Sequence, residues 1–162
     1  MLTLALSDDD ALNARLDAFP GALGDALAAK AETLALALAD AVKFDKLSGQ
    51  VLAARSGALR DSIEAEVSAD GDTVVATIGS VGDVKYAAIQ EYGGKTGAHE
   101  ILPVKGKVLA FLAGGATRFA ARVEHPGSTI PARSYLHATL DEQTDAIVAA
   151  LAATPQESWE RA

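Results

Sequence analysis

The sequence predicts an α+β fold built from antiparallel hairpins and helices. Three observations support this class: a long helical pattern from Gly21 to Phe44, a hairpin signal at Asp70-Gly71, and a second at Gly114-Gly115. The chain has 162 residues, and 49% of them are hydrophobic. This length and composition are typical of one globular domain with its own core. We therefore expect residues 1–162 to form a single domain.

The N-terminal third is expected to be helical after a short strand. Residues 1–6 place Leu2, Leu4 and Leu6 at alternate positions, which favours a strand. A first helix would begin after Ser7 or Asp8 and end at Pro20, where a second would start. The second helix, Gly21 to Phe44, has an apolar stripe at spacings of three and four. Its members are Leu23, Leu27, Ala31, Leu34, Leu38 and Ala41.

The first hairpin pattern follows a polar loop and one predicted helical turn that begins near Ser56. Ile63, Ala65 and Val67 alternate with polar residues, which is typical of a strand with one buried face. Asp70-Gly71 then predicts a tight turn. Val74, Ala76 and Ile78 repeat the alternation in the returning strand.

The second hairpin pattern runs from Val108 to Leu112 and returns from Arg118 to Val123. Its predicted core residues are Phe111, Phe119, Ala121 and Val123. A final helix is expected from Leu136, with Pro155 as its end, because proline lacks the backbone donor that a helix needs. Residues 155–162 would then form a C-terminal tail that carries Trp159.

The stretch from Val84 to Gly94 links the two hairpin patterns and predicts a short helix that the paired glycines end. Tyr86 shares a helical register with Ile89, so we expect it to point inward. Tyr92 falls on another face and is expected to meet a partner. The alternative is a packed turn whose tyrosines are satisfied within the core. The predicted contact residues here are Glu91, Tyr92, Gly93, Gly94 and Lys95.

Charge and composition argue against several classes of function. The formal net charge is -8, so the surface has no general attraction for nucleic acid. There is no cysteine, which removes disulfides and thiolate metal sites. His99, His125 and His137 stand in unrelated contexts without the spacing of a zinc site. We expect no metal and no cofactor.

Enzymatic and membrane motifs are also incomplete. Gly94-Lys95-Thr96 resembles the end of a phosphate-binding loop, but Ile89 stands where that motif needs glycine. No G-x-S-x-G elbow occurs in the sequence. The apolar run Leu34 to Ala39 is too short to span a bilayer, and residues 1–6 are too short for a signal-peptide core. The expectation is a non-enzymatic protein made in the cytoplasm.

An ordered set of short motifs resembles the tail-completion, or virion-morphogenesis, proteins of tailed bacteriophages. The motifs run in the order found in that family, from an R-[ST]-G-x-L-x-x-S-I segment to a P-A-R-x-[FY]-L segment before the last helix. In this chain they are Arg55 to Ile63, Ile78-Gly79-Ser80, Tyr86 to Gly94, and Ile130 to Leu136. Ser134 departs from the family pattern, which commonly has proline there, and Gly93-Gly94 stands where glycine-threonine is frequent.

The resemblance implies a virion protein of the head–tail junction that forms a ring, commonly a hexamer. The implied fold is a twisted antiparallel sheet with the long N-terminal and the C-terminal helix on one side. The implied partners are further copies of itself, the tail-tube protein and neck or head-completion proteins. DNA would pass through the channel without specific binding, since negative walls repel it.

Two further residues are expected at interfaces, and two other functions stay open. Arg133 is predicted to form a structural or intersubunit ion pair, because arginine binds carboxylates through two hydrogen bonds. Trp159 is predicted to contribute to a contact from the tail. The alternatives are a non-enzymatic α+β binding module outside phages, or a neck protein at another level of the junction. Self-association and binding to tube or neck proteins would separate these possibilities.

Overall fold

The computed structural model describes residues 9–52, 56–71, 73–104 and 106–161. The predicted strand of residues 1–6 and the motif residue Arg55 lie outside these ranges. The chain was expected to form one domain, whereas its internal contacts group it into two compact units. We call residues 1–87 with 134–162 the helix–hairpin unit, and residues 88–133 the ribbon unit.

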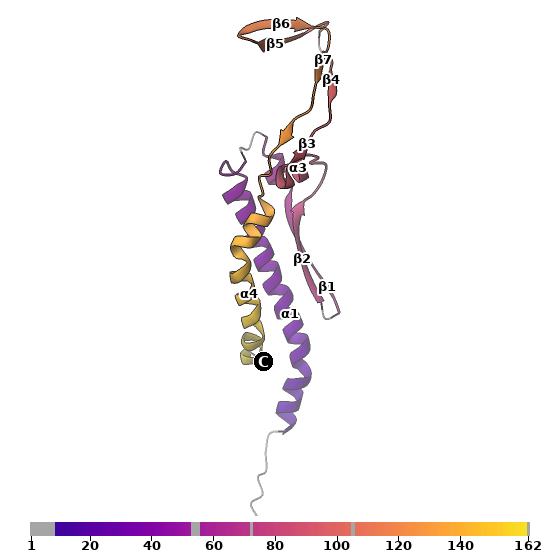
Figure 1. Ribbon diagram of the computed structural model, residues 1–162. Helices are drawn as coiled ribbons and strands as arrows, with labels where there is room; N and C mark the ends of the chain where they lie inside the picture. Colours follow the sequence, from indigo (N-terminus) through magenta and orange to yellow (C-terminus); the bar gives the residue numbers. More distant parts are fainter. Residues whose placement is uncertain (1–8, 53–55, 72, 105, 162) are drawn as a thin grey trace, which may run out of the picture. The chain divides into compact units, whose positions relative to one another are not determined.

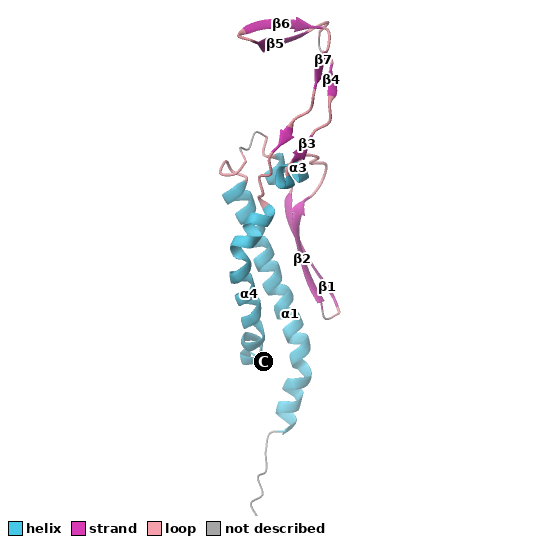
Figure 2. Ribbon diagram, in the orientation of Figure 1, coloured by secondary structure: helices cyan, strands magenta, loops and turns pink. Residues whose placement is uncertain are grey.

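The predicted combination of helices and antiparallel hairpins is confirmed (Figure 2). The described residues of the helix–hairpin unit form two long helices, two short ones and one two-stranded sheet (Figure 1). In chain order these elements are α1 (Asp9–Ala41), the π-helical turn η1 (Val42–Lys46), α2 (Ala58–Asp61), β1 (Ile63–Asp70), β2 (Thr73–Ser80) and α4 (Leu136–Arg161). The short helix α3 (Ala87–Tyr92) begins at the last residue of this segment and continues into the ribbon unit.

Helix α1 packs against both α4 and the β1–β2 hairpin, and it lies between them in Figure 1. Both long helices are therefore on the same side of this hairpin. The central core gathers at the C-terminal end of α1, where η1, α2 and the start of β1 and α4 meet. Its buried members are Ala39, Val42, Leu47, Leu59, Ile63 and Tyr135. Leu38 of the predicted stripe is buried, and its other members are partly buried.

The two helix ends predicted at proline residues are wrong. Helix α1 continues through Pro20, and α4 continues through Pro155 to Arg161, so residues 155–161 are helical and not a tail. A proline inside a helix costs about 3 kcal/mol or more. Contacts between the two helices near the prolines offset this cost. Trp159 packs edge-to-face on Phe19 at 5.3 Å between ring centroids, and Lys30 pairs with Glu157 at 3.2 Å.

The β1–β2 hairpin forms where the sequence predicted it, and its two strands show the predicted alternation. Asp70 pairs with Thr73, and Gly71 has φ +57°, as expected for a two-residue turn that needs positive φ. Ala65 lies opposite Ile78, and Val67 opposite Ala76. This face is turned toward α1, while Glu64 and Glu66 alternate onto the outer face and are exposed. The hairpin therefore has one apolar face and one polar face.

In the described residues, the ribbon unit consists of α3 from Ala88 onward and three consecutive antiparallel strand pairs. The pairs are β3 (Gly94–Lys95) with β8 (Thr129–Ile130), β4 (His99–Ile101) with β7 (Val123–His125), and β5 (Leu109–Ala113) with β6 (Ala116–Ala120). Together with β1–β2, the described strands thus form separate two-stranded sheets and not the single twisted sheet that was expected.

Candidate assembly surface

The first two strand pairs of the ribbon unit belong to one continuous register. Gly94 lies opposite Ile130, and stepping along both strands brings Thr96 opposite Ser128 and His99 opposite His125. Thr96 N–H donates to Ser128 O at 2.9 Å, and Ser128 N–H donates to the Thr96 hydroxyl at 2.8 Å. The same register brings Ala98 opposite Pro126, which has no N–H to donate. The interruption between β3–β8 and β4–β7 falls at this proline.

Two glycines allow the ribbon backbones to approach closely. Gly93 has φ +70°, and a Cβ there would lie 2.7 Å from the Ala132 backbone nitrogen. Gly127 has φ +88°, and a Cβ there would overlap the Thr96 carbonyl oxygen. Alanine would be strained at both positions, both by the left-handed conformation and by the contact. The N–H of Arg133 donates to Gln90 O at 2.8 Å, which ties the end of the ribbon to α3.

The β5–β6 hairpin, which we call the tip hairpin, exposes large apolar side chains on both faces. Its turn is Gly114-Gly115, both with positive φ, as predicted. Phe111 lies opposite Arg118 on one face, and Leu112 and Phe119 share the other face as diagonal neighbours. Leu112 is 78% exposed and Phe119 68%. The prediction that Phe111, Phe119 and Ala121 belong to a core is wrong for a single chain, and Val123 is only partly buried.

The segment that leads into the tip hairpin is also apolar and exposed. Leu102, Val104 and Val108 have exposed side chains, and Val104 is 95% exposed. A two-stranded hairpin is at best marginally stable alone in water, and it needs a packed face or further strands for stability. Contiguous exposed apolar surface usually marks an interaction site. The tip hairpin and its entry therefore form the strongest candidate interface among the described residues.

Two histidines that the sequence places 26 positions apart stack on each other in the ribbon. The rings of His99 and His125 have centroids 5.0 Å apart and an interplanar angle of 22°. The Nδ1 atom of His99 lies 3.2 Å from Gly97 O, and Gly127 N–H donates to Nδ1 of His125. The prediction of unrelated histidine contexts is wrong for this pair. This stacking depends on the pairing of β4 with β7, and no local signal in the sequence predicts that pairing.

The predicted contact residues around α3 are divided between surface and interior. Tyr92 is 69% exposed and Lys95 is exposed, as an interface role requires. Glu91 is buried, so it is not an exposed contact. Tyr86 was predicted to point inward but is 43% exposed, because α3 begins one residue later and Tyr86 lies in the preceding turn. The buried tyrosine is Tyr135, whose hydroxyl donates to Ala87 O at 3.3 Å.

Arg133 and Trp159 do not lie in the same structural unit. Arg133 has an exposed side chain, and within the described part of the chain it has no ion-pair partner. An intersubunit role for it stays a prediction. Trp159 packs on Phe19, and the Arg15 guanidinium lies 4.2 Å above its ring. Arg15 also donates to the Trp159 carbonyl oxygen. Trp159 therefore joins α4 to α1.

Several residues of the recognised motifs have packing roles. Leu59 and Ile63 are buried in the core, and the Ser62 and Ser80 hydroxyls hydrogen-bond each other at 2.8 Å. Ser62 O also accepts from the Val81 N–H. Ser134, which stands where the family often has proline, accepts from the Ala138 N–H at the start of α4. These residues thus contribute to packing and local hydrogen bonding in the fold.

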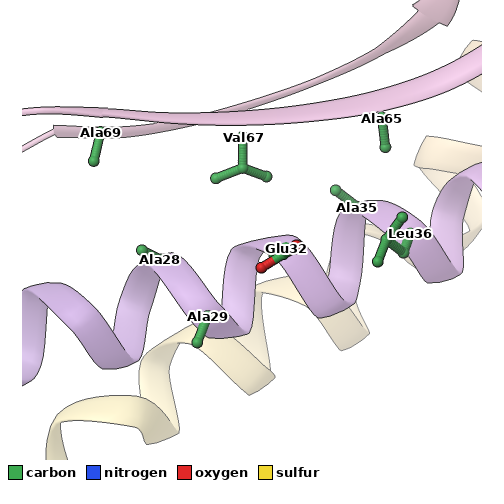
Figure 3. A pocket seen from close by; sticks show the side chains of 8 residues that line it. All are labelled: Ala28, Ala29, Glu32, Ala35, Leu36, Ala65, Val67 and Ala69. Carbon is green, nitrogen blue, oxygen red and sulfur yellow. The ribbon is translucent and has the colours of Figure 1, made fainter.

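A cleft of about 360 Å³ lies in the helix–hairpin unit between α1 and β1 (Figure 3). Ala65, Val67 and Ala69 point from β1 toward the helix, and Ala28 and Ala35 point from α1 toward the strand. Because most of these side chains are alanine, helix and strand leave space between them. The remaining lining residues are Ala29, Glu32 and Leu36.

The two units differ in charge. Residues 88–133 contain six lysines and arginines and three acidic residues, a formal charge of +3. The remainder of the chain contains eight basic and nineteen acidic residues, a formal charge of -11. The net charge of -8 is therefore the sum of two regions whose formal charges have opposite signs. Opposite potentials favour encounter between the surfaces that bear them.

Neither a metal cluster nor a membrane-spanning helix is found in the described ranges. Comparisons with protein-family models, with curated proteins and with solved structures gave no match. The ribbon unit, with its exposed apolar tip hairpin, is thus the strongest functional candidate among the described residues.

Proposed function

We propose that this chain is a structural protein of the head–tail junction of a tailed bacteriophage. In this proposal, copies of the chain form a ring, with six copies as the expected number. The ring completes or terminates the tail tube and joins it to the neck. The support from sequence is the ordered motif set between Arg55 and Leu136.

The observation that carries the proposal is the exposure of apolar side chains on both faces of the tip hairpin. Leu112 and Phe119 lie on one face and Phe111 on the other, all of them exposed. Burying such side chains gains about 25 cal/mol per Å² of apolar surface, which favours assembly over a free subunit. A structural ring subunit uses such a surface and needs no catalytic group.

The charge distribution is compatible with a channel for DNA. The helix–hairpin unit, with a formal charge of -11, would repel the phosphate backbone if it faced the channel. The proposed partners are the tail-tube protein on one side of the ring and neck or head-completion proteins on the other. No cofactor takes part.

Deletion of the gene from its phage tests the proposal directly. Cells induced without the protein should accumulate filled heads and separate tails, and the wild-type gene supplied in trans should restore joined particles. Gold-labelled antibody should mark the head–tail junction of complete virions. Normal infectious particles after deletion would contradict the proposal. A purified chain that stays monomeric but binds a non-virion protein would favour the binding-module alternative.

A further inference from the structure

We infer that the tip hairpin of one copy of this chain docks into the cleft between α1 and β1 of a second copy. The inserted side chains are Leu112 and Phe119, and the receiving surface is the alanine-lined cleft of the helix–hairpin unit. This inference rests on the proposed function, because it specifies the contact that would repeat around the ring.

Apolar complementarity is the first argument for this pairing. Leu112 and Phe119 are diagonal neighbours on one face of the tip hairpin and are largely exposed. The cleft, of about 360 Å³, is lined by apolar residues apart from Glu32. Leu36, at the cleft, is itself more than half exposed. The tip hairpin thus has large exposed side chains that no pocket of its own covers. The cleft between α1 and β1 is a pocket lined mainly by small side chains (Figure 3).

Charge is the second argument. Glu32 lines the cleft, and Asp25 lies one helical turn before Ala28 and Ala29 on the same side of α1. Within the described residues neither of these two acids has an ion-pair partner. The ribbon unit brings the opposite sign, with Lys107 before the tip hairpin.

The pairing identifies a second copy as the occupant, because both complementary surfaces belong to the same sequence. A contact between two different patches of identical subunits is heterologous, and it closes into a ring when its rotation allows. A ring of any size built this way leaves no tip hairpin and no cleft unoccupied. Such a ring buries Leu112 and Phe119 of every subunit without requiring a second kind of protein.

The absence of cysteine from the sequence provides a clean crosslinking test. Full-length Phe119→Cys carrying a size tag is mixed with untagged Ala69→Cys, so every tagged–untagged disulfide is intermolecular. The matched control is Val75→Cys, on the outer face of the same hairpin near the same end. We expect the Phe119–Ala69 heterodimer to form at least ~10-fold faster than the Phe119–Val75 heterodimer, because docking raises the effective concentration of the paired thiols.

Three outcomes would overturn the inference. Equal rates for the two mixtures, or no heterodimer at all, would mean that the tip hairpin docks elsewhere. A chain with both Phe119→Cys and Ala69→Cys that closes only within itself at high dilution would mean that each subunit fills its own cleft. Gene deletion distinguishes failure of this inference from failure of the proposed function. If one of these crosslinking results were found and gene deletion still gave separate heads and tails, the proposed contact would be wrong and the proposed function would stand. Normal virions after deletion would refute the proposed function whatever the crosslinking shows.

Discussion

The β1–β2 and β5–β6 hairpins have the same construction but different surroundings. Each has a tight two-residue turn with glycine at positive φ, at Gly71 in the first and at Gly114 and Gly115 in the second. The first hairpin turns its apolar face to α1 and exposes glutamates on the other. The second exposes apolar side chains on both faces. Turn chemistry therefore determines that a hairpin forms, whereas coverage of its faces depends on packing by an element distant in the sequence.

The largest expected effect comes from emptying a core position at the start of the first hairpin. Ile63 is completely buried, so Ile63→Ala should lower the free energy of unfolding by about 2–5 kcal/mol. Phe119→Ala, at the exposed position of the tip hairpin, should change it by less than about 0.5 kcal/mol in a dilute, dissociated sample. Urea unfolding followed by circular dichroism measures both. Comparable losses of unfolding free energy in the two variants would contradict the distinction between a covered first hairpin and an exposed tip hairpin.

An intermediate effect is expected from glycines within the ribbon unit. Gly127→Ala forces a Cβ against the Thr96 carbonyl, so it should speed hydrogen exchange at the Thr96 and Ser128 amides. Gly114→Ala is the matched control, since it also has positive φ but no atom within 4 Å of the added Cβ. It should cost only about 1–2 kcal/mol of local stability for the left-handed conformation. Unchanged exchange in Gly127→Ala would show that the ribbon adapts without cost.

The smallest effects are expected from one ion pair in each unit. Lys46 contacts Glu142 at 2.7 Å between η1 and α4, and Arg122 contacts Glu100 at 3.3 Å in the ribbon. Exposed pairs contribute about 0–1 kcal/mol, and both pairs include an exposed carboxylate. Glu142→Gln and Glu100→Gln should therefore each shift the unfolding free energy by no more than about 1 kcal/mol. A larger loss for Glu100→Gln would mean that charge, and not apolar association, organises the ribbon.

Local sequence signals correctly predicted those structural elements whose formation depends on residues close in sequence. Asp70-Gly71 and Gly114-Gly115 identified both turns, and the alternation from Ile63 to Ile78 gave the correct inner face. Proline was misleading at Pro20 and Pro155, because the contact of Trp159 with Phe19 and the Lys30–Glu157 pair are made by residues far apart in sequence. Local propensity gave way there to tertiary packing.

The candidate surface was only partly predictable for the same reason. Alternation places Phe111 and Phe119 on strand faces, but it does not reveal whether another element covers those faces. The helical register of Ile89 suggested a buried Tyr86, whereas the helix starts too late to include it. The stacking of His99 on His125, and the cleft between α1 and β1, depend on the pairing of distant segments. Tyr92 and Lys95 are exposed, as an interface role requires, and that role stays a prediction.

The central claim is that the tip hairpin makes this chain self-associate, and sedimentation velocity tests it most directly. The wild-type chain is compared with the double variant Leu112→Ser and Phe119→Ser over a range of concentrations. We predict that the wild type sediments as a closed oligomer, while the double variant sediments as a folded monomer with a near-native thermal midpoint of the dissociated chain. A wild-type chain that stays monomeric throughout, or a double variant that assembles like the wild type, would contradict the claim.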